Sequence, residues 1–382
     1  MTVVETRSSK PDHDEPNVDL FTSGDRIRVR AFGAAEAGEL AAAFAAALSL
    51  VWLIYERLTP LSGGLGFWVC VYVAFLAIAW FVAREQRGSV VARDQVARIV
   101  VWSGGLGLIV PLTLIVGVVF AHGYHALTPH FFTQDQRLVG PLQSSKAGGG
   151  SAAIVGTLEQ VGIAALISVP LGVTTAVFLN EVGGWLARPV RTIVDAMSAI
   201  PSIIAGLFIY ALWIRALHQH FSGFAAALAL TVLMVPTVTR TTELVFRLVP
   251  GGLREASLAL GSTEWRTTRH VVLPTARSGV MTAVILGIAR VVGETAPLLL
   301  VLGGTNVFEK NPLHQQDGLP LFVYKQYFLL AQPSTIPRAW TGALVLLGMV
   351  LVLFVAARLV GGQGPGHISR IRRMRLSRKG LA

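Results

Sequence analysis

Two charged residues lie inside a long apolar segment of the sequence. Arg290 and Glu294 are four residues apart within the block 278–302, so a continuous helix would place them on one face. A charged side chain that faces lipid costs at least about 2.5–3.5 kcal/mol, and both should therefore face protein or water. A guanidinium stays ionised and offers a planar fork of donors to an oxyanion. We expect these residues to line an anion pathway, in which Glu294 neutralises Arg290 between passages.

A structural role is the alternative for each charged candidate. Arg290 and Glu294 could form an ion pair that only locks two spans together. Arg240, at the end of another apolar block, could line the inner end of the pathway, or it could reach the membrane surface and pair with Glu243.

The same segment contains two residues that favour a bend. Gly293 precedes Glu294, and Pro297 follows it. Pro297 lacks the N–H that would bond the carbonyl of Gly293 in a regular helix. We expect the helix to bend between them.

Several kinds of chemistry are absent from the sequence. No Gly-x4-Gly-Lys-[Ser/Thr] phosphate loop occurs, so any ATP must be hydrolysed by another subunit. The single cysteine, Cys70, excludes an intramolecular disulfide. Histidines gather in two loops without cysteines and with few carboxylates, which favours solvated side chains over a metal site. We expect no catalytic residue, no metal site and no cofactor bound by this chain.

Apolar blocks account for most of the chain and must form the elements that position these residues. The chain has 382 residues, of which 53% are hydrophobic and 14% charged. Blocks of about 20 apolar residues are long enough to cross a ~30 Å hydrocarbon layer as helices. The pattern predicts an all-α polytopic membrane protein. The first block is the weakest and could instead be an interfacial helix. The eight predicted spans are 36–55, 65–83, 99–121, 155–179, 194–214, 224–245, 278–302 and 339–358.

The basic residues predict the orientation of these spans. With both termini placed in the cytoplasm, 24 of the 32 Lys and Arg residues fall on the cytoplasmic side, as the positive-inside rule requires. The formal net charge of +11 therefore reflects topology mainly. The basic segment 370–379 is better suited to anionic lipid headgroups than to nucleic acid. No apolar block lies near Met1, which excludes a cleavable signal peptide.

A helix pair is predicted in the loop 250–275, between the sixth and seventh spans. The helix breakers at 250–252 precede a short helix over 253–260, which Gly261 ends. Ser262 is placed to cap a second helix, and Leu273–Pro274 should redirect the chain into the seventh span. Such a pair would form a rigid projection that transmits movement from a soluble partner.

This loop resembles the EAA loop of ABC importer permeases. Glu-Ala-Ser, then Gly, then Val-Val-Leu-Pro stand at the spacing of that motif, with Ser257 in place of the second alanine and Val271 in place of isoleucine. In the family the loop forms a coupling helix that docks into the ATPase subunit. The resemblance implies ATPase coupling by Glu255, Ala256, Ser257, Gly261, Leu273 and Pro274.

A second phrase narrows the resemblance. The segment 287–299, which contains Arg290 and Gly-Glu-Thr-Ala-Pro, is similar to the seventh-span signature of PstA-type permeases of phosphate importers. The related PstC type lacks the Ala-Pro, so Ala296 and Pro297 favour the PstA type. The resemblance implies a type I ABC importer permease fold with a six-helix core.

The family core and the additional segments divide the chain as follows. The resemblance implies a transmembrane core at 96–360, which includes the coupling loop 250–275. Two additional N-terminal transmembrane helices occupy 34–95. A polar cytoplasmic tail, 1–33, precedes them, and a basic cytoplasmic tail, 361–382, ends the chain.

The resemblance also implies partners and location. A PstC-type chain would complete a heterodimeric permease, and two PstB-type ATPase subunits would use ATP and Mg. A PstS-type binding protein would deliver inorganic phosphate from outside, and the complex would lie in the lipid of the bacterial inner membrane. Two alternatives remain: a permease for another oxyanion such as sulfate or molybdate, and a membrane regulatory scaffold that does not transport.

Overall fold

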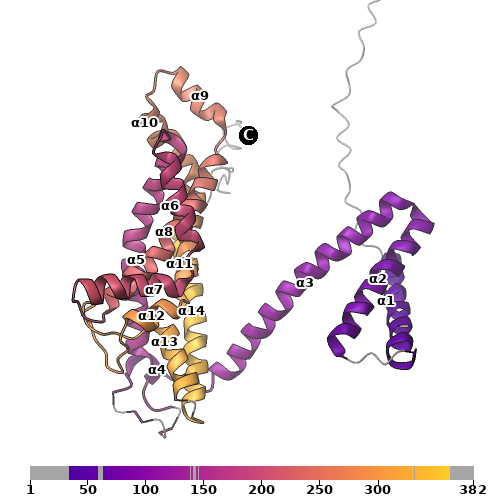
Figure 1. The fold of residues 1–382 in the computed structure, drawn as a ribbon, viewed down its shortest axis with the longest axis horizontal. Coiled ribbons are helices and arrows are strands. Elements are labelled where there is room, and N and C mark those ends of the chain that lie inside the picture. Colours follow the sequence, from indigo (N-terminus) through magenta and orange to yellow (C-terminus); the bar gives the residue numbers. More distant parts are fainter. Residues whose placement is uncertain are drawn as a thin grey trace, which may run out of the picture. The chain divides into compact units, whose positions relative to one another are not determined.

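The described part of the chain is entirely helical. The computed structural model describes residues 34–58, 63–137, 139–140, 143–144, 146–330 and 332–361. Within them there is no β-strand, and one isolated bridge joins Gly303 to Gln316 (Figure 1). The expected all-α class is confirmed. The predicted tails, 1–33 and 361–382, lie outside the described residues except for Gly361.

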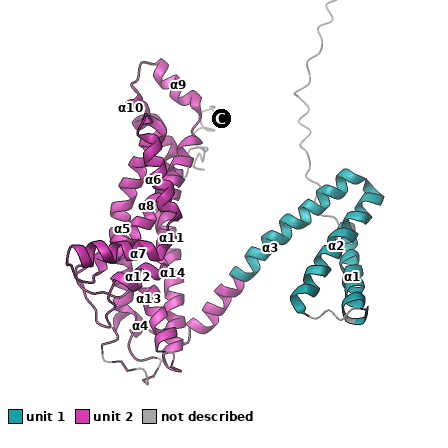
Figure 2. Ribbon diagram, in the orientation of Figure 1, with its two compact units in different colours: residues 1–112 teal, residues 113–382 magenta. Residues whose placement is uncertain are grey.

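The chain divides into two compact units. Unit 1 is Met1–Leu112 and unit 2 is Thr113–Ala382 (Figure 2). The division falls inside one continuous helix, α3 (Ser89–Gly123). The sequence placed the boundary between the additional helices and the family core at residues 95 and 96. The division into units does not test that boundary, which remains a prediction.

The described residues contain helices of spanning length and composition. Seven helices meet both criteria, and a bent helix pair would make an eighth span. The seven are Glu36–Tyr55, Gly64–Arg87, Ser89–Gly123, Ser151–Val182, Gly223–Arg247, Glu264–Val292 and Thr335–Leu359.

Unit 1 contains the two helices that precede α3. The first is α1 (Ala34–Trp52), which continues as a π-helical turn, η1 (Leu53–Leu58), and the second is α2 (Gly64–Arg87). The guanidinium of Arg87 joins them through Glu39 at 2.5 Å and Glu36 at 3.7 Å. The first apolar block thus has the length of a span and a defined helical partner.

The segment 84–98, between the second and third predicted spans, is helical apart from one residue. Gly88 ends α2 with a φ of 88°, a conformation in which a side chain would be strained. α3 begins at the next residue, because the N–H of Ala92 already bonds the carbonyl of Gly88 at 3.1 Å.

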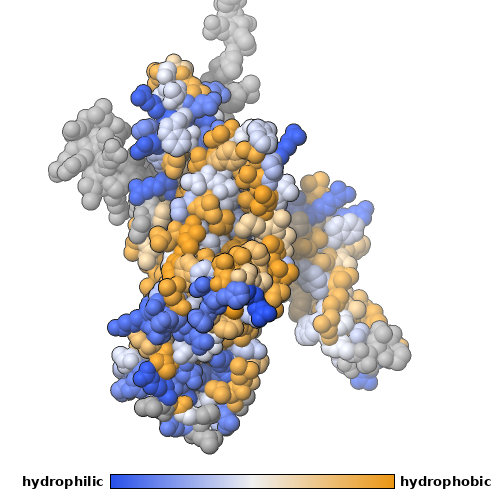
Figure 3. Space-filling view, turned by 60° about the vertical axis from the view of Figure 1, so that its left-hand side comes forward, coloured by the Kyte–Doolittle hydropathy of each residue, from blue (hydrophilic) through white to orange (hydrophobic). Residues whose placement is uncertain are grey.

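Unit 2 is a helical bundle. Its helices are α4 (Pro129–Thr133), α5 (Ser151–Val177), α6 (Ala187–Ala199), α7 (Ser202–Ile209), α8 (Gly223–Arg247), α9 (Gly251–Ala259), α10 (Glu264–Thr267), α11 (Leu273–Val292), α12 (Ala296–Val301), α13 (Leu319–Tyr324) and α14 (Thr335–Gly361). Its π-helical turns are η2 (Phe178–Val182), η3 (Tyr210–Ala216), η4 (Thr268–Val272) and η5 (Lys325–Leu329). One view of its surface shows an apolar band between two more hydrophilic ends (Figure 3). This pattern suits a protein that crosses a membrane.

Helix α8 forms the core of unit 2. It is the most buried candidate span, with 72% of its apolar window inside the protein. Glycines let its neighbours approach: a Cβ on Gly172 of α5 or Gly287 of α11 would lie 2.9 Å or 2.7 Å from the side chain of Val238. Small residues at such contacts allow close packing of helices in a membrane.

The fifth predicted span is not one straight helix. α6 and α7 meet at an angle of 105°. Pro201 follows Ile200, and the residue before a proline is driven out of the helical region, which explains its ψ of 125°. Figure 1 shows α7 lying across the bundle.

The loop between α8 and α11 differs from its predicted details. Gly251 and Gly252 belong to α9, with Pro250 as its N-cap, so they do not break the helix. Thr263, rather than Ser262, caps α10 by accepting a bond from the N–H of Arg266 at 3.4 Å. Pro274 does not redirect the chain. It lies in the first turn of α11, where no N–H is required, within a helical segment that runs from Glu264 to Val292.

Candidate functional site

Arg290 lies in the last turn of α11 and contacts α8. Its Nη1 donates a hydrogen bond to Oγ1 of Thr237 at 3.1 Å. No carboxylate of the described residues lies within 4.0 Å of this guanidinium, and the side chain is exposed in the isolated chain. Its charge is therefore uncompensated. Thr237 was not singled out in the sequence, although it stands three residues before Arg240.

Glu294 does not share a helical face with Arg290. α11 ends at Val292, and Glu294 lies in the break before α12, where its N–H bonds the carbonyl of Val291 at 3.2 Å. The expected bend between Gly293 and Pro297 is a full break of the helix. The expectation that the pair stands at helical i and i+4 positions is wrong, and no ion pair joins them.

Close packing of α12 against α7 explains this break. A Cβ on Gly206 of α7 would lie 2.6 Å from Cα of Pro297. Pro297 occupies the first turn of α12, where it needs no N–H donor, and it is buried. The chain turns at Gly293 and seats α12 against α7, which separates Glu294 from the face of α11.

Arg240 belongs to a group of charges between α6 and α8. We call this group the Glu243 cluster: Glu243, Asp195, Arg191, Arg240 and Arg247. The carboxylate of Glu243, only 2% exposed, accepts bonds from Arg247 at 2.7 Å, Arg191 at 2.8 Å and Arg240 at 2.9 Å. Arg240 also pairs with Asp195.

The cluster joins α6 to α8 and leaves one formal positive charge. A buried carboxylate needs such partners, because its desolvation is otherwise unfavourable. Arg240 thus pairs with Glu243, as the structural alternative for this residue requires. Sequence reasoning missed Arg191 and Asp195. Their i, i+4 spacing on α6 was a signal, but the contacts of Arg191 with Glu243 and of Asp195 with Arg240 require the packing of α6 on α8.

Three side-chain contacts hold the α9–α10 pair to the rest of unit 2 and to each other. Arg254 pairs with Glu181 of η2 at 2.8 Å and donates to the carbonyl of Phe246 at 3.0 Å. The hydroxyls of Ser257 and Thr267 lie 2.9 Å apart and join α9 to the segment that leads into α11.

Much of the rest of this helix pair is exposed. Glu255 and Ala256 are exposed, Leu260 is 88% exposed, and Gly261 ends α9 with a φ of 80°. The side-chain contacts that hold α9 lie on η2, α8 and α10.

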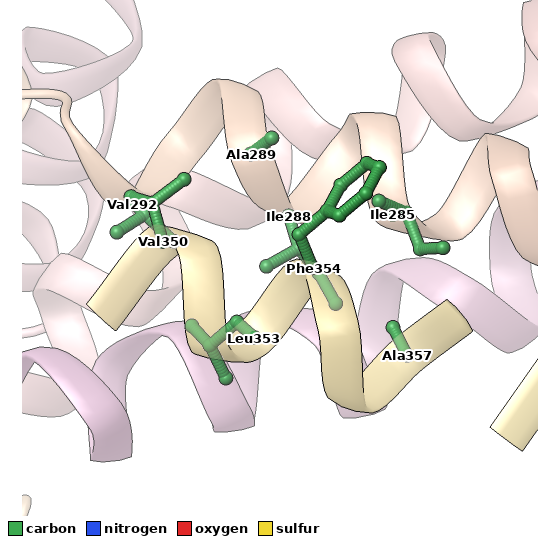
Figure 4. A pocket seen from close by; sticks show the side chains of 8 residues that line it. All are labelled: Ile285, Ile288, Ala289, Val292, Val350, Leu353, Phe354 and Ala357. Atoms are coloured by element: carbon green, nitrogen blue, oxygen red, sulfur yellow. The ribbon is translucent and has the colours of Figure 1, made fainter. Parts of the chain in front are cut away.

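A small gap between α11 and α14 is not part of this site. It has a volume of about 10 Å³, close to the minimum for one water. Figure 4 shows the apolar side chains that line it, which include Ile288, Ala289 and Val292 on α11. It offers no side-chain donor to an anion.

Comparison with a protein-family model identifies the core of the chain. The model described as "Binding-protein-dependent transport system inner membrane component" matches residues 168–362. This range contains Arg240, Arg290, Glu294 and the whole α9–α10 pair. It begins within α5, so unit 1 lies outside it.

Individual relatives are similar over a longer part of the chain than the family model. The chain is 40% identical over 273 residues to the phosphate transport system permease protein PstA 1 of Mycobacterium tuberculosis (strain CDC 1551 / Oshkosh), and the match covers 70% of this chain and 88% of the relative. It is 39% identical over 217 residues to PstA of Yersinia pestis, covering 56% and 73%. A solved chain of the MetNI methionine ABC transporter, in an inward-facing conformation, has a TM-score of 0.45 and 23% identity, covering 56% of this chain and 93% of its own.

Proposed function

Because the chain belongs to the family of binding-protein-dependent transport inner-membrane components, and within it to the phosphate transport system permeases, we propose that it is the permease subunit of an ATP-driven phosphate importer. It forms part of the phosphate pathway and is moved by an ATPase on another chain. The names of the relatives do not favour a sulfate or molybdate permease or a scaffold without transport.

The uncompensated charge of Arg290 carries this proposal. A guanidinium that an acidic residue neutralised would have little attraction left for an anion, whereas among the described residues Arg290 has only the hydroxyl of Thr237 as a hydrogen-bond partner. Thr237 orients the side chain without cancelling its charge. Phosphate can accept two bonds from such a fork. Glu294, half-buried in the break before α12, would line the pathway rather than neutralise Arg290 directly.

Arg240 would act beyond Arg290 along α8. Thr237 and Arg240 are three residues apart, so they lie on neighbouring turns of one helical face. The net positive charge of the Glu243 cluster would favour an anion that leaves Arg290. Its ion pairs would also hold α6 against α8 during the movement.

The α9–α10 pair would receive the ATPase. Its exposed surface would dock into that subunit, and Arg254 and Ser257 would transmit the movement to η2 and α11. A second permease chain would complete the pathway, and a phosphate-binding protein would deliver substrate at the opposite side of the inner membrane. The pathway would alternate between inward-facing and outward-facing states.

Replacement of Arg290 tests the proposal. In the assembled complex, Arg290→Gln should abolish phosphate uptake while assembly and basal ATPase activity are retained, because glutamine keeps a donor but removes the charge. Arg277→Gln is a matched control, since Arg277 is an exposed arginine on the same helix. Normal uptake by the Arg290→Gln complex would contradict the proposed role.

A further inference from the structure

A polar cavity lies at the end of unit 2 opposite the α9–α10 pair. In Figure 1 this end contains α4 and α13. The cavity has a volume of about 210 Å³, and a water needs only about 10–15 Å³ on such a measure, so a small ion with its waters would fit. Its polar lining consists of Gln136, Asn306, Asp317, Lys325, Gln326 and Arg338.

Arg338 brings a buried charge to this cavity. The residue is 2% exposed, and its Nη2 donates to the backbone carbonyls of Gln143 at 3.1 Å and Ser144 at 2.7 Å. Carbonyls are neutral, and no carboxylate of the described residues lies within 4.0 Å of the guanidinium. Its Nε is buried without a hydrogen-bond partner. A buried charge with a spare donor is costly unless a ligand meets it.

Lys325 adds a second cation, which pairs with one carboxylate. Its Nζ lies 3.0 Å from the carboxylate of Asp317, a residue 4% exposed. Burial raises the pKa of Asp317 above its usual value, against the lowering effect of Lys325 and of the bond from the N–H of Gly318. Asp317 can therefore cancel at most one of the two positive charges.

We propose that this cavity binds a phosphate group between Lys325 and Arg338, as a site separate from the Arg290 region. Two cations, a spare guanidinium donor and room for a tetrahedral oxyanion are the features that would recognise it. The group comes either from inorganic phosphate in solution or from a lipid headgroup. A role of this site in transport rests on the proposed function, whereas anion binding itself does not.

A cysteine reporter at the cavity tests the charge directly. Asn306 lines the cavity and is exposed, so Asn306→Cys places a reactive thiol there. Cys70→Ser removes the single native cysteine of this chain. In the assembled complex in phosphatidylcholine nanodiscs, an anionic methanethiosulfonate reagent should modify this cysteine several-fold faster than a cationic one. Lys325→Gln should remove most of that preference and Lys325→Arg should retain it. Lys310→Gln, which replaces an exposed lysine outside the cavity lining, should leave it unchanged.

Two further arms distinguish the sources of the phosphate group. Slower modification in the presence of inorganic phosphate identifies the free ion. Slower modification without added phosphate, only in nanodiscs that contain phosphatidylglycerol, identifies the headgroup. No preference for the anionic reagent, together with no protection in either arm, would overturn the proposal. If Lys325→Gln does not assemble, these protection measurements decide without it.

Transport measurements separate this site from the proposed function. If the cavity captures phosphate for import, Lys325→Gln should raise KM several-fold and leave kcat nearly unchanged. A wild-type complex that takes up no phosphate would refute the proposed function, while the cysteine reporter would still decide whether the cavity binds phosphate.

Discussion

Arg290 and Arg240 have the same side chain and different partners. Arg240 meets the two carboxylates of Glu243 and Asp195, whereas Arg290 meets one hydroxyl. An arginine whose charge is compensated stabilises contacts between helices, and one whose charge is free attracts an anion. This difference separates the residue proposed to bind phosphate from the residues that hold α6 to α8.

Glu243 is the residue whose loss should affect that contact most. Glu243→Gln would leave three guanidiniums around a neutral amide, and removing one partner of a buried ion pair costs about 3–5 kcal/mol. Because the three arginines are partly exposed, we expect the free energy of unfolding to fall by about 3 kcal/mol at most. The thermal unfolding midpoint of the purified chain in detergent should fall clearly.

Asp195→Asn provides the matched control. The side chain of Asp195 is 55% exposed and contacts only Arg240 within the cluster, so its loss should cost less than about 1 kcal/mol. Equal destabilisation by the two variants would contradict the central role of Glu243.

At the scale of elements, hydropathy predicted which segments are helical but not where they break. The span expected at 194–214 is bent because Pro201 stands in its middle, a signal that an apolar average conceals. In the segment 278–302, Gly293 and Pro297 did predict a bend, but its extent, a full break, comes with the packing of α12 on Gly206, which is distant in sequence. Arg290 could be identified as a candidate from its charge alone. Its partner Thr237 could not, because that contact requires the packing of α11 on α8.

The close packing of α11 on α8 at Gly287 should be sensitive to an added methyl group. In Gly287→Ala, the added Cβ would lie 2.7 Å from Cγ2 of Val238 and 3.3 Å from Cε of Met234. Such overpacking typically costs about 1–3 kcal/mol. It would also move Arg290, one turn along α11, away from Thr237. We expect a lower unfolding midpoint and slower phosphate uptake.

Gly162→Ala is the matched control, because nothing lies within 4 Å of an added Cβ at this position in α5. Alanine at an open helical position should stabilise the chain by about 0.4–1 kcal/mol. Loss of stability in both variants would show that close approach at Gly287 is not the cause.

At the scale of the whole molecule, none of the residues proposed for transport belongs to unit 1. The family match at 168–362 lies in unit 2, as do Arg290, the Glu243 cluster and α9. The contacts of Arg87 with Glu36 and Glu39 stabilise unit 1 internally. The resemblance that indicated the transport core therefore gives no function to α1 and α2.

Truncations test whether these two helices act as a pair of spans. Deletion of residues 1–88 removes two spans, so α3 would enter the membrane from the same side, and the complex should assemble and take up phosphate at nearly the full rate. Deletion of residues 1–62 removes one span and would place the four arginines of 84–98 on the wrong side, against the positive-inside rule. That chain should fail to assemble, as measured by copurification of the ATPase subunit. Normal assembly of the 1–62 deletion would instead indicate that α1 lies at the membrane interface, because removing an interfacial helix leaves the orientation of α2 unchanged.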